Sequence, residues 1–217
     1  RDAGGLWDKY PVEQVATPEG YARNPELVIN FYNERRKQLL DVVPNAGHLG
    51  VADLERDFNV TVVTQNVDNL HERAGSTHVI HLHGELTKVC SSRDPYNPHF
   101  VKELAPEEYE VKLGDKAGDG TQLRPFIVWF GESVPEIETA IRYVEQADIF
   151  VIIGTSLNVY PAAGLLNYVP RAAEVYLIDP KPVDTHVMRP IHVIQKGASE
   201  GVKELKALLT ATQPPLP

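Results

Sequence analysis

Two histidines stand two positions apart in the segment HLHGEL, as His81 and His83, directly before Gly84. An imidazole titrates near neutral pH, so such a ring can take a proton from a substrate as a general base. The alternative is structural, with a histidine that simply caps a strand before a glycine, since most histidines are not catalytic. Residue type alone leaves both interpretations open.

A second candidate site consists of small and polar residues that close short apolar runs. Such residues suit a nucleotide, because small residues admit the backbone to phosphates, hydroxyls donate to them, and an acid can hold ribose hydroxyls. Ordinary capping of loops by polar residues is an equally good explanation of the pattern. The set comprises Gln65, Asn66, Asp68, Gly154, Thr155, Ser156 and Asp179.

Parallel α/β winding is the arrangement that would bring this polar set together. Three apolar runs are too short for helices and predict buried strands, and helical segments lie around them. In an open parallel sheet, ligands bind outside the carboxyl ends of the strands, where the polar set is expected. The strands are predicted within 60–68, 147–156 and 173–180, and the helices within 45–58, 135–146 and 161–169.

An amphipathic helix is predicted earlier in the chain, over residues 24–40. Asn24 before Pro25 is typical of an N-cap followed by proline in the first turn. The segment 91–123 is different, because it is rich in proline, glycine and charge and has little periodicity. It indicates an irregular insertion or a small subdomain.

Composition limits the class of protein. With 217 residues and 42% hydrophobic content, the chain can bury one substantial core and carry a small attached subdomain. Its net charge of -9 gives no basic face for nucleic acid, and no apolar run approaches the roughly 20 residues of a membrane span. The single cysteine, Cys90, excludes an internal disulfide and a four-cysteine zinc site. We expect a cytoplasmic monomer without nucleic-acid or membrane partners.

Six motifs in order along the chain resemble the sirtuin family of NAD-dependent protein-lysine deacylases: RDAGGLW, TQNVDNLHERAG, HLHGEL, WFGE, GTSLNVYPAAG and LIDP. The resemblance implies a Rossmann-like parallel sheet with helices on both faces and a small discontinuous subdomain, with an acyl-lysine peptide in the cleft between them. The domains then correspond to residues 1–9, 49–84 and 125–217 for NAD binding, and 10–48 and 85–124 for the small domain.

The resemblance makes His83 the catalytic base, whereas His81 does not match that position. In the implied reaction the acyl oxygen attacks the nicotinamide ribose, nicotinamide leaves, and His83 takes a proton from a ribose hydroxyl. The products are free lysine, nicotinamide and O-acyl-ADP-ribose, so the enzyme is a transferase of acyl groups.

The resemblance also implies contacts to NAD and to the peptide. For Val128, as for its neighbour Trp129, burial in the core is an equal alternative. The expected NAD contacts are Arg1, Gln65, Asn66, Asp68, Gly154, Thr155, Ser156, Asp179 and Ala198. The expected peptide contacts, from two loops that pair with it as an added strand, are Val128, Phe130, Gly131, Glu132, Leu157, Asn158 and Val159.

Tyr32 and Arg35 lie three residues apart, and so on one face of the predicted helix. In a subclass of sirtuins, a Tyr-x-x-Arg pair reads the carboxylate of succinyl- or malonyl-lysine. A guanidinium binds a carboxylate bidentately and a phenol adds a hydrogen bond, so the chemistry is sound. Against it, the charge run ERRKQ is typical of a solvated helix face. We expect deacetylation alongside removal of acidic acyl groups.

Two departures from the family pattern stand out. Most sirtuins carry four zinc-binding cysteines, but here Cys90 and His99 supply only two soft ligands, so no zinc is expected and the small domain must be held by packing. The family's first strand and glycine-rich NAD loop would precede Arg1, and we expect them upstream.

Two rival functions remain: transfer of ADP-ribose to a protein, and a non-catalytic module that binds NAD or acyl-lysine.

Overall fold

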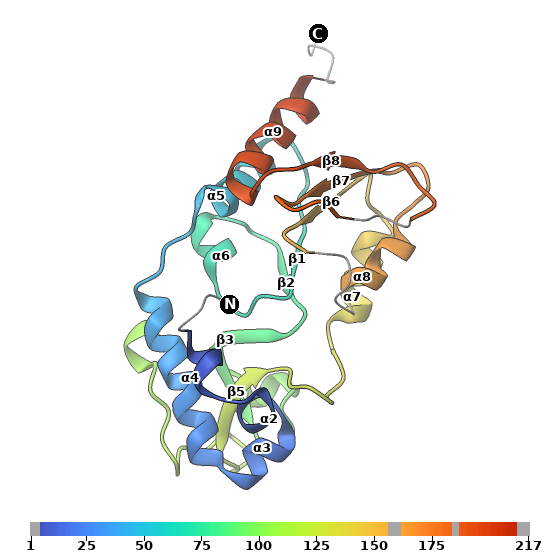
Figure 1. Ribbon diagram of the computed structural model, residues 1–217. Helices are drawn as coiled ribbons and strands as arrows, with labels where there is room; N and C mark the ends of the chain where they lie inside the picture. The colour runs from blue at the N-terminus through green and yellow to red at the C-terminus, as the bar shows by residue number, and fades with distance from the viewer. Residues whose placement is uncertain (1–4, 156–161, 184–186, 212–217) are drawn as a thin grey trace. The chain divides into compact units, whose positions relative to one another are not determined.

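The computed structural model describes residues 5–155, 162–183 and 187–211. The chain forms two compact units, which we call unit 1 and unit 2 (Figure 1). Unit 1 comprises Arg1–Val43, Thr64–Asn69 and His81–Pro135, and unit 2 comprises Pro44–Val63, Leu70–Ile80 and Glu136–Pro217. The predicted small-domain segments 10–48 and 85–124 lie almost wholly in unit 1. That unit also contains residues 1–9, 64–69, 81–84 and 125–135, which the prediction assigned to the NAD-binding domain.

A parallel sheet forms the centre of unit 2 (Figure 1). Its order is β6 (Ile149–Ile153), β7 (Glu174–Ile178) and β8 (His192–Ile194), and both pairings are parallel. The predicted strands within 147–156 and 173–180 are thus confirmed, whereas β8 was not predicted. Because all of these strands run in one direction, their carboxyl ends meet at one edge of the sheet.

Helices pack on this sheet at close range. In α9 (Ala198–Ala211), Gly201 lies so near β7 that an added Cβ would stand 2.2 Å from the Ile178 side chain. An added Cβ at Gly50 of α5 (Ala46–Asp53) would stand 2.7 Å from the Val202 side chain, so α5 and α9 also pack closely together (Figure 1). The predicted helices are confirmed, as α5 with η1 (Leu54–Arg56), as α7 (Ile137–Val144), and as α8 (Ala162–Leu165) with η4 (Leu166–Tyr168).

Residues 62–81 form two short strands with a short helix between them in sequence. β1 (Val62–Thr64) and β2 (Val79–His81) form a 2-stranded sheet, and α6 (Leu70–Ala74) lies between them in sequence. The strand predicted within 60–68 is therefore confirmed. None of the described helices is long and apolar enough to cross a membrane.

The long helix of unit 1 is α4 (Pro25–Leu40), preceded by α1 (Leu6–Lys9), α2 (Val12–Val15) and α3 (Pro18–Arg23). The Asn24 side chain accepts a hydrogen bond from the Leu27 backbone N–H at 3.2 Å, as the predicted N-cap requires. Helix α4 buries polar as well as apolar residues, among them Asn33 and Arg36. The charge run ERRKQ is therefore only partly a solvated face.

Beside α4 lies an antiparallel sheet of order β4 (Lys102–Glu103), β3 (Gly84–Ser91) and β5 (Leu123–Ile127). The irregular character predicted for 91–123 is confirmed, since only β4, η2 (Pro98–Phe100) and η3 (Pro106–Glu108) interrupt its loops. The pairing of its two flanks as β3 and β5 was not predicted, because neither flank alternates clearly between polar and apolar residues.

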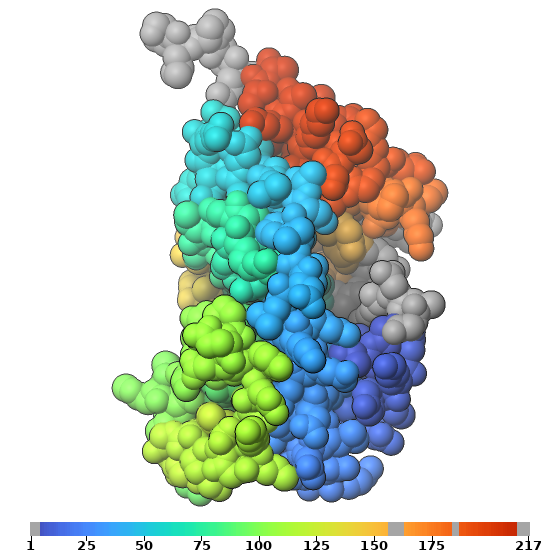
Figure 2. All heavy atoms as spheres, turned by 90° about the vertical axis from the view of Figure 1, so that its left-hand side faces the viewer, coloured from blue at the N-terminus to red at the C-terminus, as the bar shows by residue number. Residues whose placement is uncertain are grey.

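Buried hydrogen bonds fasten this segment to α4. The Asn33 amide donates to the Val111 carbonyl at 2.8 Å and accepts from the Val111 N–H at 2.9 Å. Arg36 donates to the Tyr109 carbonyl at 2.8 Å and to the Leu86 carbonyl at 3.4 Å. Figure 2 shows α4 and the residues after β4 side by side on one face of unit 1. The expectation that packing holds this segment is thus incomplete, because polar groups of α4 also fix it.

A second set of hydrogen bonds closes the far end of the antiparallel sheet. The Ser91 hydroxyl donates to the Asp119 carboxylate and accepts from the N–H groups of Arg93 and Asp94 at 3.0 and 2.9 Å. The same carboxylate accepts from both the N–H and the hydroxyl of Thr121. These donors hold the pKa of Asp119 down at about 2, with the Ser91 hydrogen bond as the largest cause.

We expect Asp119→Asn to lower the thermal midpoint of unfolding at neutral pH. The folded-state pKa lies below the usual 3.8, so this stabilisation is present above that pH and disappears as the pH falls towards about 2. Thermal scans of both proteins across this range should therefore converge in acid. Asp115→Asn is the control, since the Asp115 carboxylate accepts a single exposed hydrogen bond, from the Lys112 backbone N–H. A gap between Asp119→Asn and wild type that persists at pH 2 would contradict the assignment.

Candidate active site

His83 lies in the turn between β2 and β3, and is half-buried. Its backbone carbonyl accepts a hydrogen bond from the Val128 N–H at 2.9 Å, which fixes the turn to the end of β5. Burial lowers the pKa of the His83 imidazole from its usual 6.5, and a hydrogen bond to the Gln65 backbone opposes that shift. The ring is therefore neutral at physiological pH, as a proton acceptor must be.

His81 has a different environment, because its side chain is buried. Its Nδ1 lies 3.1 Å from the carbonyl oxygen of Asn66, and the next residue of that loop, Val67, accepts from the Leu86 N–H at 2.8 Å. His81 thus helps to hold the loop that follows β1, which carries Gln65, Asn66 and Asp68.

Gly84, directly after His83, occupies a position that only glycine can fill. Its φ is +85°, and an added Cβ would stand 2.1 Å from the Phe126 carbonyl oxygen. We expect Gly84→Ala to destabilise the protein by more than the roughly 1–3 kcal/mol typical of a strained backbone alone. Gly120→Ala is the matched control, since Gly120 has φ +81° but nothing within 4 Å of a Cβ. Chemical denaturation should separate the two variants; equal losses would mean that the close approach to Phe126 has no energetic consequence.

The predicted nicotinamide contacts lie in the loop after β1. The side-chain oxygen Oε1 of Gln65 is buried and has no hydrogen-bond partner among the described residues. A buried acceptor without a donor is unfavourable, and an amide N–H would satisfy it. Asn66 is exposed and Asp68 is half-buried. This loop therefore fits the carboxamide and hydroxyl groups of a nicotinamide nucleoside.

The predicted phosphate and adenosine contacts of unit 2 gather at the carboxyl edge of its parallel sheet. Gly154 and Thr155 follow β6, Asp179 follows β7, and Ala198 begins the helix after β8. Gly154 has φ +66° and nothing within 4 Å of a Cβ, so its backbone is open to close approach. Asp179 uses Oδ1 to accept from the Lys181 N–H at 2.8 Å. Arg1, Ser156, Leu157, Asn158 and Val159 lie outside the described residues.

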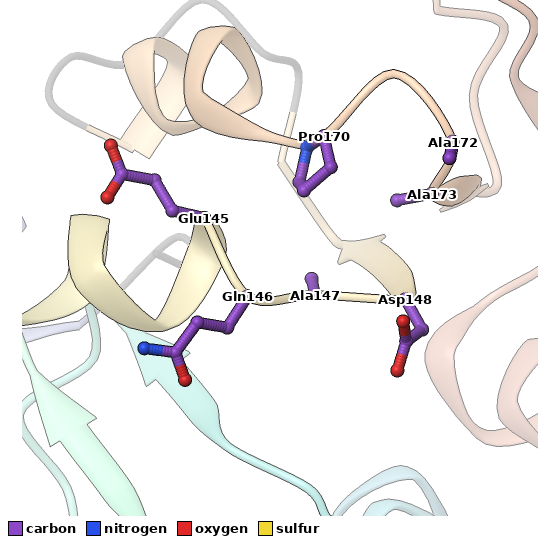
Figure 3. A pocket seen from close by; sticks show the side chains of 7 residues that line it. All are labelled: Glu145, Gln146, Ala147, Asp148, Pro170, Ala172 and Ala173. Atoms are coloured by element: carbon purple, nitrogen blue, oxygen red, sulfur yellow. The ribbon is translucent and has the colours of Figure 1, made fainter.

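A cavity of about 300 Å³ lies at the opposite edge of this sheet. Figure 3 shows it between the end of α7 and the loop before β7, with Glu145 and Asp148 on one side and Pro170 on the other. These residues precede β6 and β7, and ligands of open α/β sheets bind beyond the carboxyl ends of the strands. This cavity is therefore not the expected nucleotide site.

The predicted peptide loop of unit 1 is a tight turn in which the Glu132 N–H donates to the Trp129 carbonyl at 3.0 Å. Phe130 is 66% exposed at its tip, and Gly131 adopts φ +90°. Trp129 is only 2% exposed, so for this residue the core alternative is confirmed. The Glu132 carboxylate binds the Arg124 guanidinium at 3.1 and 3.0 Å. This ion pair stabilises the turn.

Tyr32 and Arg35 lie in one aromatic cluster of unit 1. The Arg35 guanidinium carbon is 5.1 Å from the ring centroid of Trp7, 5.9 Å from that of Phe31 and 5.7 Å from that of Tyr32. Burial lowers the pKa of Arg35, while Tyr32 and Asp68 oppose this shift. Arg35 makes no hydrogen bond or ion pair with the residues that the structure describes. Tyr32 is fully buried, and its hydroxyl accepts from the Trp129 indole N–H at 3.0 Å.

Cys90 and His99, the two soft ligands noted in the sequence, have dissimilar surroundings. The Cys90 side chain is fully buried in β3, and burial raises the pKa of its thiol to about 12. His99 is exposed in η2. The thiolate that zinc requires is thus strongly disfavoured at Cys90.

Comparison with known proteins gives the family. The model of the Sir2 family matches residues 1–161. The chain belongs to the Sir2 family. An NAD-dependent protein deacylase of Bacteroides thetaiotaomicron is 84% identical over 209 residues, which cover 96% of this chain and 89% of that protein. One of Helicobacter pylori is 47% identical, with coverages of 94% and 87%. The prediction of a sirtuin enzyme is therefore confirmed.

Solved Sir2 structures show the same fold. A Sir2 homologue in complex with NAD has a TM-score of 0.79 and 35% identity, covering 96% of this chain and 82% of its own. A mutant Sir2 homologue in complex with 2'-O-acetyl ADP ribose has a TM-score of 0.81 and 35% identity, covering 100% and 87%. The predicted Rossmann-like sirtuin fold is thereby confirmed.

Two residues beside the candidate site, Trp7 and Arg124, were not predicted from the sequence. Trp7 belongs to the motif RDAGGLW without a predicted role of its own, and Arg124 lies outside all six motifs. A usable signal existed for Arg124, because an arginine before the apolar run PFIVWF needs a buried partner, and Glu132 follows that run. For Trp7 the sequence holds no comparable signal.

Proposed function

We propose that this Sir2-family enzyme, an NAD-dependent protein deacylase, prefers lysines that carry a succinyl or malonyl group and also removes acetyl groups. One observation carries the proposal: Arg35 is a partly buried cation, held by the rings of Trp7, Phe31 and Tyr32 and without an ion pair among the described residues. A desolvated guanidinium in this state binds a carboxylate strongly.

The neighbours of Arg35 on α4 argue against the solvated-face alternative. Glu34 and Lys37 are exposed, as a solvated face requires, but Arg36 is buried and donates hydrogen bonds to the carbonyls of Tyr109 and Leu86. Arg35 lies between these extremes, since its guanidinium is stacked on rings while its hydrogen-bonding edge is not taken by the described residues. Stacking immobilises the side chain and so lowers the entropy lost when it binds a ligand.

We propose one group of NAD contacts on each unit. Gln65, Asn66 and Asp68 would hold the nicotinamide and its ribose, and Gly154, Thr155 and Asp179 would hold the phosphates and the adenosine ribose. When bound, NAD would supply the ribose carbon that the acyl oxygen attacks as nicotinamide leaves. His83 accepts a proton from a ribose hydroxyl, for which its lowered pKa keeps the ring neutral.

The peptide contacts are proposed on the turn around Phe130. Its ring is exposed at the tip, and the backbone of the turn is fixed by the Arg124–Glu132 ion pair. Main-chain pairing to such a turn depends little on side chains, so we expect only a weak preference for peptide sequence.

The test is a set of peptides of one sequence whose lysine carries an acetyl, butyryl or succinyl group. Nicotinamide release and deacylated peptide are measured with NAD for each. Butyryl matches succinyl in chain length but lacks the carboxylate, so kcat/KM for succinyl should exceed that for butyryl. A preference for butyryl would refute the acidic-acyl proposal. Modified peptide carrying ADP-ribose would indicate ADP-ribosyl transfer, and binding without nicotinamide release would indicate a non-catalytic module.

A further inference from the structure

We propose that Trp129 is a positioning residue for acyl selection, which fixes the Tyr32 hydroxyl as a hydrogen-bond donor to the acyl carboxylate. The proposal rests on the function proposed above and assigns a specific role to a buried tryptophan of the core. It follows from the hydrogen bond of 3.0 Å between the Trp129 indole Nε1 and the Tyr32 oxygen.

The chemistry of the two side chains determines the direction of this hydrogen bond. An indole N–H can only donate, whereas a phenol can donate one hydrogen and accept at its oxygen. The Tyr32 oxygen must therefore be the acceptor, and its own hydrogen has to find another partner. No acceptor for that hydrogen occurs among the described residues, although Tyr32 is fully buried. A buried donor without an acceptor is costly, and a carboxylate would relieve that cost.

The same hydrogen bond strengthens Tyr32 as a donor. Donation from Trp129 stabilises negative charge on the phenol oxygen and opposes the burial that raises the pKa of Tyr32 to about 12. Hydrogen bonds in a chain polarise one another, so an accepting phenol donates more strongly. Arg35, stacked 5.7 Å from the Tyr32 ring centroid, supplies a positive charge beside the same hydroxyl-bearing ring.

Trp129 is itself held from the other side. The Arg124 guanidinium carbon lies 3.7 Å from its ring centroid, and the Glu132 carboxylate accepts from the Trp129 backbone N–H at 2.8 Å. Because Glu132 also binds Arg124, the indole is clamped between an ion pair and α4. The position of its N–H, and with it that of the Tyr32 hydroxyl, is thereby fixed before a substrate binds.

The experiment compares desuccinylation and deacetylation by wild type, Trp129→Phe, Tyr32→Phe and the double variant. Trp129→Phe keeps an aromatic ring beneath Arg124 but removes the N–H. We expect its ratio of desuccinylation to deacetylation, as kcat/KM, to fall roughly fivefold, mainly through KM for the succinyl peptide. In the Tyr32→Phe background the same change should have no further effect on the ratio, because its target hydroxyl is gone.

A purely structural role of Trp129 would lower both activities together and would add to Tyr32→Phe, and either result overturns the proposal. If Trp129→Phe does not fold, β-(3-benzothienyl)alanine at position 129, which replaces the N–H by sulfur, should give the same selective fall. If Trp129→Phe leaves the ratio of desuccinylation to deacetylation unchanged, while Arg35→Met lowers desuccinylation selectively, this inference alone is rejected. A wild-type enzyme that does not prefer succinyl over butyryl rejects both this inference and the proposed function.

Discussion

His83→Ala is expected to reduce formation of deacylated peptide by roughly 10²- to 10⁴-fold, the range typical of a lost general base. The structure supports this, because His83 is half-buried in a turn fixed by Val128 and its ring is neutral at physiological pH. The measurement is deacylated peptide per enzyme with NAD in excess. His81→Ala does not serve as the matched control, since His81 holds the loop after β1.

His99→Ala is the better control, because His99 is exposed in η2 and should leave activity unchanged. The pH profile gives a second readout. A general base works in its neutral form, so kcat/KM should rise with pH and level off, with a midpoint below the usual 6.5. Equal rates for wild type and His83→Ala would show that this imidazole is not the base.

Arg35→Met should lower kcat/KM for desuccinylation by roughly 10- to 100-fold while changing deacetylation little. The reason is the loss of charge-assisted hydrogen bonds to the acyl carboxylate, worth about 1.5–3 kcal/mol. Methionine keeps an unbranched chain among the rings of Trp7, Phe31 and Tyr32, so the cluster should remain packed. The measurement is the ratio of the two activities at several peptide concentrations.

Lys37→Met provides the matched control on the same helix, because Lys37 is exposed and lies two positions from Arg35. It changes the charge of α4 by the same amount without touching the aromatic cluster. Equal losses of desuccinylation and deacetylation in Arg35→Met would remove the basis for acyl selection by this residue.

Much of unit 2 could be predicted from the sequence because its strands are short apolar runs that end in glycine or acid. β6 and β7 were located in this way, and the residues after them fall at one sheet edge, as parallel winding requires. β8 was missed because two of its three residues are exposed, which gives no apolar run.

The environment of the candidate site was less predictable. The spacing of Tyr32 and Arg35 indicated a shared helix face, but not that Trp129, 97 residues further along, would bond to the Tyr32 hydroxyl. Such contacts depend on tertiary packing between segments far apart in sequence. Glu132 illustrates the same point, since a loop residue expected to contact peptide has its carboxylate bound to Arg124.

The buried thiol of Cys90 makes this protein convenient for labelling. It is the single cysteine of the chain, it is fully buried, and its thiol has a pKa of about 12, so alkylating reagents find almost no thiolate in the folded state. A cysteine introduced at an exposed position, such as Phe130 on the turn proposed to contact peptide, would then be the one reactive thiol of this sequence. A fluorophore attached there would test whether peptide binds at this turn, without removal of the native cysteine.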